Sequence, residues 1–193
     1  AIPSVVYGLW GIFVLAPFLR SEFQPWVIEH FGWFPLFAGP AYGVGMFSAA
    51  LILSVMITPT ISSISREVFR AIPHSYREAA IALGATRWET IKIAVLKTGR
   101  AGVFGAVILG LGRALGETMA VTMLIGNRSQ ISASLFAPAQ TMASAIANEY
   151  VEATSDVHLA ALAEVGLILF AVTFIVNAIA RLIIRRVTSR GGA

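Results

Sequence analysis

The sequence contains no cysteine and few charged residues, and each shortage excludes a class of protein. Without cysteine there can be no disulfide, no thiolate metal site and no cysteine nucleophile. Charged residues make up 12% of the 193 residues, about half of the share usual in soluble domains, whereas hydrophobic residues make up 57%. The three histidines are scattered, so we expect no metal site. This composition is typical of an integral membrane protein.

Four apolar segments are long enough to cross a hydrocarbon core of roughly 30 Å at about 1.5 Å per helical residue. They cover residues 2–19, 42–62, 101–125 and 159–184. The predicted fold class is therefore all-α, a polytopic membrane protein with four spans. No initiator methionine or basic segment precedes the first apolar run, so we expect no signal peptide and interpret the sequence as a piece of a longer chain.

Basic residues are divided unevenly between the connecting segments. Eleven of the 14 lie in the loop between the second and third spans and in the C-terminal tail. These eleven are Arg66, Arg70, Arg77, Arg87, Lys92, Lys97, Arg100, Arg181, Arg185, Arg186 and Arg190. Because such residues are retained on the cytoplasmic side, we predict that the loop of about 66–100 and the C-terminus are cytoplasmic. The net charge of +4 thus reflects membrane orientation, and we expect no nucleic-acid partner.

Two outer segments connect the remaining spans. Residues 21–40 are rich in Phe and Trp, which predicts either an aromatic belt at the membrane interface or a half-inserted helix. Residues 129–156 combine small and polar residues, which favours a short helix packed against the bundle at the outer mouth.

The cytoplasmic loop has clear local signals. Ser75 precedes Glu78 by three residues, and Thr86 precedes Glu89 by three, so both pairs have the spacing of a capping box. Pro73 ends the preceding helix, and Gly84 has the position of a left-handed C-terminal residue. We expect a short helix over 75–83, a glycine turn, and a second helix from Thr86 toward the third span. A solvated connecting loop is the alternative.

The third span contains two full charges, Arg113 and Glu117. A charged side chain at mid-bilayer costs roughly 2.5–3.5 kcal/mol on insertion scales, and such residues face an interior or a watery path. At 100° per residue both lie on a stripe about 80° wide. The other members of this stripe are mostly small: Ala106, Gly110, Ala120 and Leu124.

Arg113 and Glu117 are four residues apart, so a continuous helix would let them pair. The planar guanidinium of Arg113 suits phosphate oxygens, and Glu117 would act as a counter-ion that prevents the anion from binding too tightly. We therefore predict that both residues line a substrate path. A structural salt bridge that fixes helix packing is the alternative.

The stretch "EAAIALGA", Glu78 to Ala85, resembles the EAA loop of ABC importer permeases, although Ala94 and Lys97 depart from the pattern further along. The whole chain resembles PstC-type permease subunits of phosphate-importing ABC transporters, most specifically at "GLGRALGETMAVTMLIGN". The resemblance implies the type I importer transmembrane domain over residues 1–186, lacking part of its N-terminus, and a cytoplasmic tail over 187–193.

The resemblance also implies a function and a set of partners. The chain would be the membrane-spanning subunit of an ATP-driven phosphate importer in a bacterial inner membrane, with inorganic phosphate as the transported substrate. Glu78, Ala79, Ala80 and Gly84 would dock onto a cytoplasmic ATPase present in two copies. A second, homologous permease and an extracytoplasmic phosphate-binding protein would complete the assembly.

The chain has no G-x-x-x-x-G-K-[S/T] motif, which is the ATP-binding P-loop. We therefore expect the partner to bind ATP and Mg²⁺ and to hydrolyse ATP. The chain itself is expected to be no enzyme and to bind no cofactor. Two alternatives stay open. One is a permease of the same architecture for another oxyanion, such as sulfate or molybdate. The other is a membrane scaffold or sensor subunit that docks a partner without moving solute.

Overall fold

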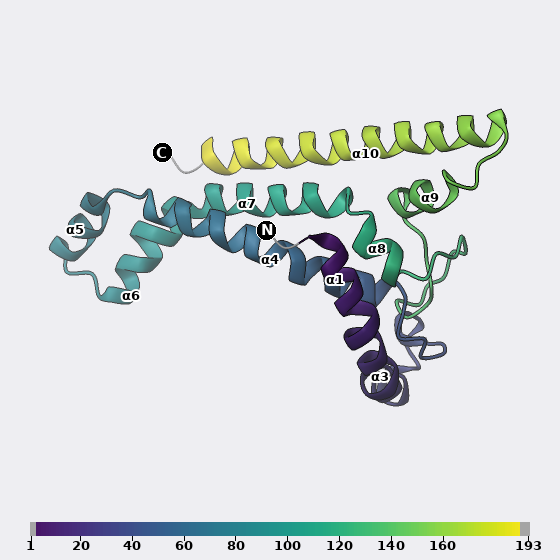
Figure 1. The fold of residues 1–193 in the computed structure, drawn as a ribbon. Helices are drawn as coiled ribbons and strands as arrows, with labels where there is room; N and C mark the ends of the chain where they lie inside the picture. Colours follow the sequence, from purple (N-terminus) through teal and green to yellow (C-terminus); the bar gives the residue numbers. More distant parts are fainter. Residues whose placement is uncertain (1–2, 190–193) are drawn as a thin grey trace. The chain divides into compact units, whose positions relative to one another are not determined.

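The computed structural model describes residues 3–189, and every element named in that range is helical, which confirms the all-α prediction (Figure 1). Four helical stretches of the described residues are long and apolar enough to cross a membrane. They are Ser4–Phe31, Met46–Arg70, Arg87–Leu115 and Asp156–Ile184. The helices divide into two compact units, Ala1–Met56 with Ala114–Val172 and Ile57–Arg113 with Thr173–Ala193, and each is described by itself.

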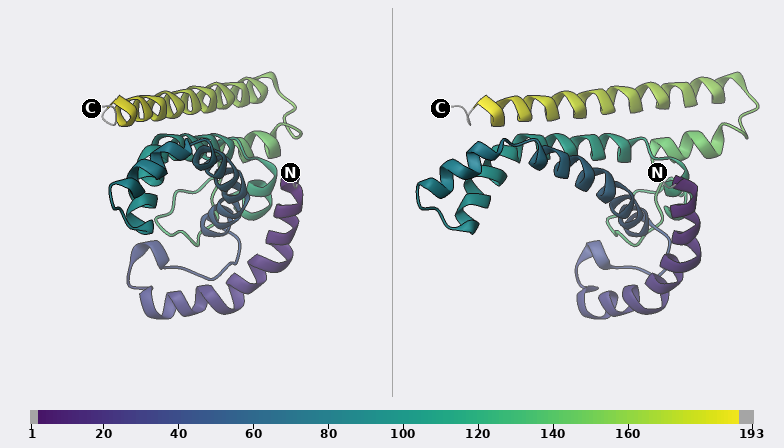
Figure 2. Two further views of the ribbon diagram at one scale, coloured as in Figure 1. Left: turned by 90° about the vertical axis from the view of Figure 1, so that its left-hand side faces the viewer. Right: turned by 60° about the vertical axis from the view of Figure 1, so that its left-hand side comes forward.

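The first span is longer than predicted, because the helix does not end at Arg20. Figure 2 shows it as one curved helix composed of α1 (Ser4–Trp10), η1 (Gly11–Leu15), α2 (Ala16–Phe18), η2 (Leu19–Phe23) and α3 (Gln24–Phe31). The two π-helical turns η1 and η2 come just before Pro17 and Pro25. A wider turn accommodates a proline ring that lacks an N–H and would crowd the preceding carbonyls. Much of the aromatic outer segment is therefore helical, and it ends in the short η3 (Pro35–Phe37).

The core of the first unit surrounds α8 (Met119–Leu124). Ala120, Val121 and Leu124 are buried there against Leu15 of η1 and Ile52 of α4 (Met46–Arg70). Other buried members of this cluster are Ala16, Leu19, Ala49 and Ile125. The short helix α8 is thus held on several sides by apolar contacts, which fixes its position in the unit.

In the second unit, α7 (Thr98–Leu115) packs closely against the second half of α4. A Cβ atom added at Gly110 would lie 2.7 Å from the Cγ1 atom of Ile61, and one at Gly102 would lie 2.5 Å from a methyl group of Val68. Only glycine at these positions allows the two backbones to approach so closely. The helix α7 continues from α6 (Arg87–Thr90) and η4 (Ile91–Lys97), as expected for a helix that runs from the loop into the span.

The segment over 129–156 contains the predicted short helix, α9 (Met142–Glu149). Thr141 and Ser144 form a capping box at its start, with the hydroxyl of Thr141 accepting from the N–H of Ser144 at 3.1 Å. The last helix is α10 (Asp156–Ser189). The predicted tail begins within this helix, and its residues 190–193 lie outside the described range, as does residue 2 of the first predicted span.

Candidate functional site

The predicted continuous helix over 101–125 is wrong at its outer end. The helix α7 ends at Leu115, residues 116–118 are not helical, and α8 begins at Met119. Gly116 is a poor helix former, and the hydroxyl of Thr118 donates to its carbonyl at 3.2 Å, which satisfies that group outside a helix. The break falls directly between the two charged residues that the sequence placed on one helical stripe.

Glu117 lies in the break, two residues before α8 begins, and does not continue α7. Its carboxylate accepts from the backbone N–H of Ala120 at 3.3 Å, and its own N–H donates to the carbonyl of Ala114 at 3.2 Å. A carboxylate near the start of a helix accepts a hydrogen bond from a free N–H group, and its negative charge interacts favourably with the positive end of the helix dipole. The half-buried Glu117 therefore has a structural partner, and pairing with Arg113 along one continuous helix does not hold.

Arg113 belongs to the second unit, where its side chain is exposed. The neighbouring Gly112 faces α10, since a Cβ added there would lie 3.6 Å from the Oδ1 atom of Asn177. Asn177 is half-buried, and its amide donates to the carbonyl of Thr173 at 2.8 Å. Sequence reasoning missed Asn177, although an amide in an otherwise apolar span was the available signal.

The loop over 66–100, predicted to be cytoplasmic, forms a compact pair of helices, α5 (His74–Ala82) and α6, which Figure 2 shows projecting beyond the ends of α4 and α7 in the second unit. The capping box of Thr86 and Glu89 is confirmed: the carboxylate of Glu89 accepts from the N–H of Thr86 at 2.8 Å. Gly84 has φ +85°, which confirms the left-handed residue in the turn. The box predicted at Ser75 and Glu78 is wrong, since no side chain caps α5.

The start of α5 is decided by Pro73. This residue is extended, with φ −55° and ψ 139°, so the first helical residue is His74. Ser75 then occupies the second helical position, from which its hydroxyl cannot act as the N-cap. The prediction that Pro73 stops the preceding helix is confirmed, because α4 ends at Arg70.

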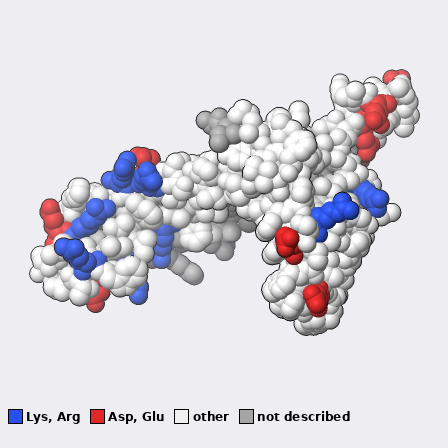
Figure 3. Space-filling model, turned by 60° about the horizontal axis from the view of Figure 1, so that its bottom comes forward, with Lys and Arg blue, Asp and Glu red and all other residues white. Residues whose placement is uncertain are grey.

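The residues predicted to dock a partner lie on the surface of this helical pair. Glu78, Ala79 and Gly84 are exposed and Ala80 is half-buried. Beside them Leu83 is 89% exposed and Ile81 is 59% exposed. The side chain of Arg77 holds the pair to the end of α4 by donating to the carbonyl of Phe69 at 3.4 Å. Basic side chains, interspersed with fewer acidic ones, lie at this end of the second unit (Figure 3), in agreement with the uneven charge of the sequence.

Within residues 3–184, whose side chains the structure describes, no cluster of three or more His, Asp or Glu residues is arranged to hold a metal ion. The polar features of this part of the chain are instead single charges, hydroxyls and amides near helix ends. Such groups can bind an anion or a partner protein, but they do not form a metal centre.

Comparison with known proteins gives consistent matches. Residues 1–189 match the sequence model of the family described as binding-protein-dependent transport system inner membrane component. The chain is 50% identical to the phosphate transport system permease protein PstC of Mesorhizobium japonicum, over 100% of this chain and 60% of that protein. It is 47% identical to PstC of Pasteurella multocida, over 100% of this chain and 61% of that protein.

A more distant relative is the probable phosphate transport system permease protein PstC of Methanocaldococcus jannaschii, which is 41% identical over 92% of this chain and 57% of that protein. The chain therefore spans about three fifths of the length of the curated relatives that it matches. No solved structure matches it.

Proposed function

The chain belongs to the family of inner membrane components of binding-protein-dependent transport systems, and we propose that it is the membrane-spanning subunit of an ATP-driven phosphate importer. The observation that supports this most is the similarity along the whole chain to proteins named phosphate transport system permease. The four apolar helices agree with a multi-pass membrane protein. In this proposal the chain forms part of the translocation path and couples it to a cytoplasmic ATPase.

Arg113 and Glu117 are the proposed substrate-path residues. The exposed guanidinium of Arg113 offers paired N–H donors to a phosphate oxyanion. Glu117 supplies negative charge and, through its bond to the N–H of Ala120, fixes the start of α8. An anion that approached Glu117 would be repelled, so the two residues together favour passage over tight binding. The helix break between them is itself typical of substrate sites in transporters, where interrupted helices line a cavity.

The projection made by α5 and α6 is the proposed docking site for the ATPase. Glu78, Ala79, Ala80 and Gly84 mark its tip, and two large apolar side chains, Ile81 and Leu83, are exposed beside them. Apolar side chains grouped on a surface indicate a partner interface. The capping box at Thr86 and the bond from Arg77 to α4 hold the projection at a fixed angle, so a force on it is transmitted to the spans.

The complete assembly that we propose contains two copies of the ATP-binding subunit, a second homologous permease and an extracytoplasmic phosphate-binding protein. It lies in the plasma membrane of a bacterium, the inner membrane, with the loop over 66–100 and the C-terminus in the cytoplasm. ATP and Mg²⁺ are bound and used by the ATPase, so this chain has no catalytic residue of its own. No nucleic acid takes part.

The test is ATP-dependent uptake of labelled phosphate into vesicles that hold the intact complex, with sulfate as competitor. Arg113→Ala is compared with wild type and with Arg66→Ala, an exposed arginine outside the proposed path. We expect Arg113→Ala to abolish uptake while the ATPase subunits still co-purify, and Arg66→Ala to retain it. Arg113→Lys should restore only part of the flux, because an ammonium ion lacks the planar fork.

The outcomes separate the alternatives. Flux that sulfate competes away would identify another oxyanion as the substrate. Undiminished phosphate flux in Arg113→Ala would make this arginine a packing residue. Absence of flux in wild type, with the complex assembled, would favour the scaffold or sensor subunit.

Docking is tested separately by co-purification. Ala79→Trp places a large ring at the tip of the projection and should reduce the recovered ATPase at least tenfold, whereas Ser75→Ala on the same helix should not. Equal recovery of the ATPase with Ala79→Trp would remove this residue from the interface.

A further inference from the structure

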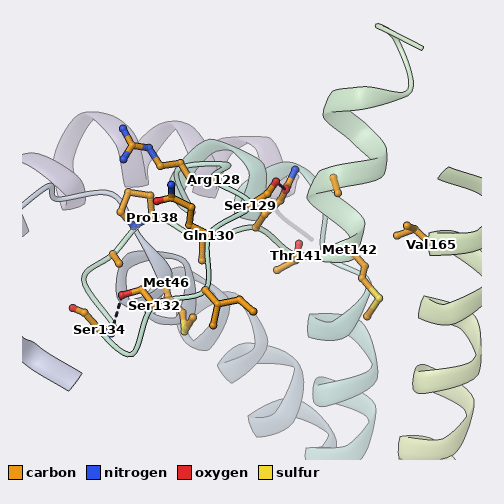
Figure 4. A pocket seen from close by; sticks show the side chains of 15 residues that line it. Met46, Arg128, Ser129, Gln130, Ser132, Ser134, Pro138, Thr141, Met142 and Val165 are labelled. Carbon is orange, nitrogen blue, oxygen red and sulfur yellow. Dashed lines mark hydrogen bonds between the residues drawn. The ribbon is translucent and has the colours of Figure 1, made fainter. Parts of the chain in front are cut away.

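The first unit contains a cavity of about 480 Å³ at the outer end of α8, and its polar lining is made by one loop (Figure 4). Arg128, Gln130, Ser132 and Ser134 lie on this loop, with Thr141 and Met142 at the start of α9 and Val165 on α10 completing the wall. The same four polar residues of the loop also line a second, adjoining cavity of about 330 Å³. Arg128 therefore borders both spaces.

The charge that lines the two cavities is positive. Arg128 is the only charged residue that lines either of them within the described part of the chain, and no carboxylate does. No ion pair engages its exposed guanidinium among the described side chains. An unpaired arginine in a recess without acids attracts anions, because field lines concentrate in a concave surface of low dielectric constant.

Two hydroxyl groups of the loop accept hydrogen bonds from the backbone. Ser132 accepts from the N–H of Ser134 at 3.1 Å, and Ser134 accepts from the N–H of Phe136 at 3.2 Å. Each oxygen accepts one backbone hydrogen bond, and among the described residues neither hydroxyl donates one. A hydroxyl in this state has a free O–H to offer to an oxyanion.

The loop is fixed in place where Arg128 leaves α8. The N–H of Arg128 donates to the carbonyl of Ala139 at 3.2 Å, and the N–H of Ala139 donates to the carbonyl of Ile125 at 2.9 Å. Asn127 has φ +48°, and its amide donates to the carbonyl of Thr122 at 2.7 Å, as expected for a cap on the end of this helix. The guanidinium therefore starts from a rigid backbone, and not from a free loop.

We propose that this cavity is an outer entry site that binds a hydrated tetrahedral oxyanion, inorganic phosphate, with Arg128 as its cation and the hydroxyls of Ser132 and Ser134 as donors. The proposal rests on the proposed function and extends it to the outer mouth. At about 30 Å³ per water, 480 Å³ holds an anion with much of its hydration shell, which predicts weak binding suited to transit.

The position of the cavity fits an entry site. Glu117 lies two residues before the first residue of α8 and Arg128 lies four residues after its last, so the two flank this helix of six residues within the first unit. At 1.5 Å per residue this helix is about 9 Å long. An anion held at Arg128 is thus separated along the chain from the proposed path residue Glu117 by this short helix and the few residues that flank it.

The first experiment measures binding without transport, and it uses the absence of native cysteine. Ser132→Cys, in the intact complex in vesicles, is labelled with an anionic and a cationic methanethiosulfonate reagent, and modification of this chain is followed by mass spectrometry. We expect the anionic reagent to react about tenfold faster than the cationic one, and inorganic phosphate to slow it. Arg128→Gln should remove both effects, whereas Ser21→Cys, an exposed control outside the cavity, should show neither.

The second experiment measures phosphate uptake by the same complex at increasing concentrations of phosphate-loaded binding protein. For an entry site, Arg128→Gln lowers the maximal uptake severalfold and leaves the half-saturating concentration of binding protein unchanged. Arg20→Gln, an exposed arginine that lines neither cavity, is the matched control and leaves both unchanged.

Each result has a separate meaning. A changed half-saturating concentration with normal maximal uptake would overturn the proposal and assign Arg128 to docking of the binding protein. Equal reaction of the two reagents, with wild-type uptake intact, would also overturn the entry site and leave the proposed function standing. Phosphate protection of the Ser132→Cys thiol without uptake by wild type would support the site while refuting the proposed importer.

Discussion

Replacement of Gly126 by alanine should loosen the turn that positions Arg128, and the structure gives the size of the effect. Gly126 has φ +90°, a conformation that costs an L-residue roughly 1–2 kcal/mol. An added Cβ would also lie 2.6 Å from the Cβ atom of Pro138, within a rigid ring, and such overpacking costs about 1–3 kcal/mol. Together the local opening free energy should fall by about 2–5 kcal/mol.

Hydrogen exchange followed by mass spectrometry measures this opening in the intact complex. The amides of Arg128 and Ala139, whose hydrogen bonds close the turn, should exchange at least 30-fold faster in Gly126→Ala, since each 1.4 kcal/mol is a factor of about ten. Gly84→Ala is the matched control, because Gly84 has φ +85° but no atom within 4 Å of the added Cβ. Its effect on the amide of Ala85 should be only about 5- to 30-fold.

Unchanged exchange at Arg128 and Ala139 in Gly126→Ala would refute the reasoning, since the turn would then tolerate both the strain and the overlap. Equal effects of the two substitutions would show that the left-handed backbone alone matters and that Pro138 moves away freely.

Three other substitutions test the packing and caps on which the site depends. Thr86→Ala should speed amide exchange in the first turn of α6 by about fivefold, whereas Ser75→Ala should leave α5 unchanged, because only the first residue is a cap. Gly110→Ala should lower the temperature at which heating removes the elution peak of the complex, because the added Cβ would lie 2.7 Å from Ile61. Gly105→Ala should not lower it, since the nearest atom to its added Cβ is 4.0 Å away. The side-chain oxygen of Gln24 accepts a hydrogen bond from the N–H of Gly43. Gln24→Leu should therefore speed exchange of the Gly43 amide, because this N–H would be left buried without a partner.

The helices and turn of the loop over 66–100 could be predicted well because their signals are local. Pro73, Gly84 and Thr86 act on backbone angles and hydrogen bonds within a few residues, so their effects do not depend on distant contacts. The one local error, at Ser75, arose because two residues compete to start the same helix. Pro73 wins since its fixed φ and extended ψ make His74 the first helical residue.

The outer half of the third span could not be predicted in the same way. The apolar run over 101–125 has enough length for one helix, and nothing in its composition shows that it is broken at 116–118. The break is stabilised by contacts from elsewhere in the chain, because Val121 and Leu124 of α8 are buried against α4 and the first helix. The prediction that Arg113 and Glu117 lie on one stripe assumed a continuous helix. The break shows that this assumption is wrong, and both residues stay candidates for the substrate path.

The sequence by itself determined that the chain is helical and membrane-spanning and that the loop over 66–100 and the C-terminal tail are basic, because these follow from apolar length and charge counted along the chain. Only the tertiary structure decided that Glu117 caps a separate short helix and that Arg128 borders a cavity without acids. Gly126 and Ala139, 13 positions apart, pair through their backbones beside this cavity, which Ala139 helps to line. Such contacts depend on how distant segments pack, and no local pattern in the chain encodes them.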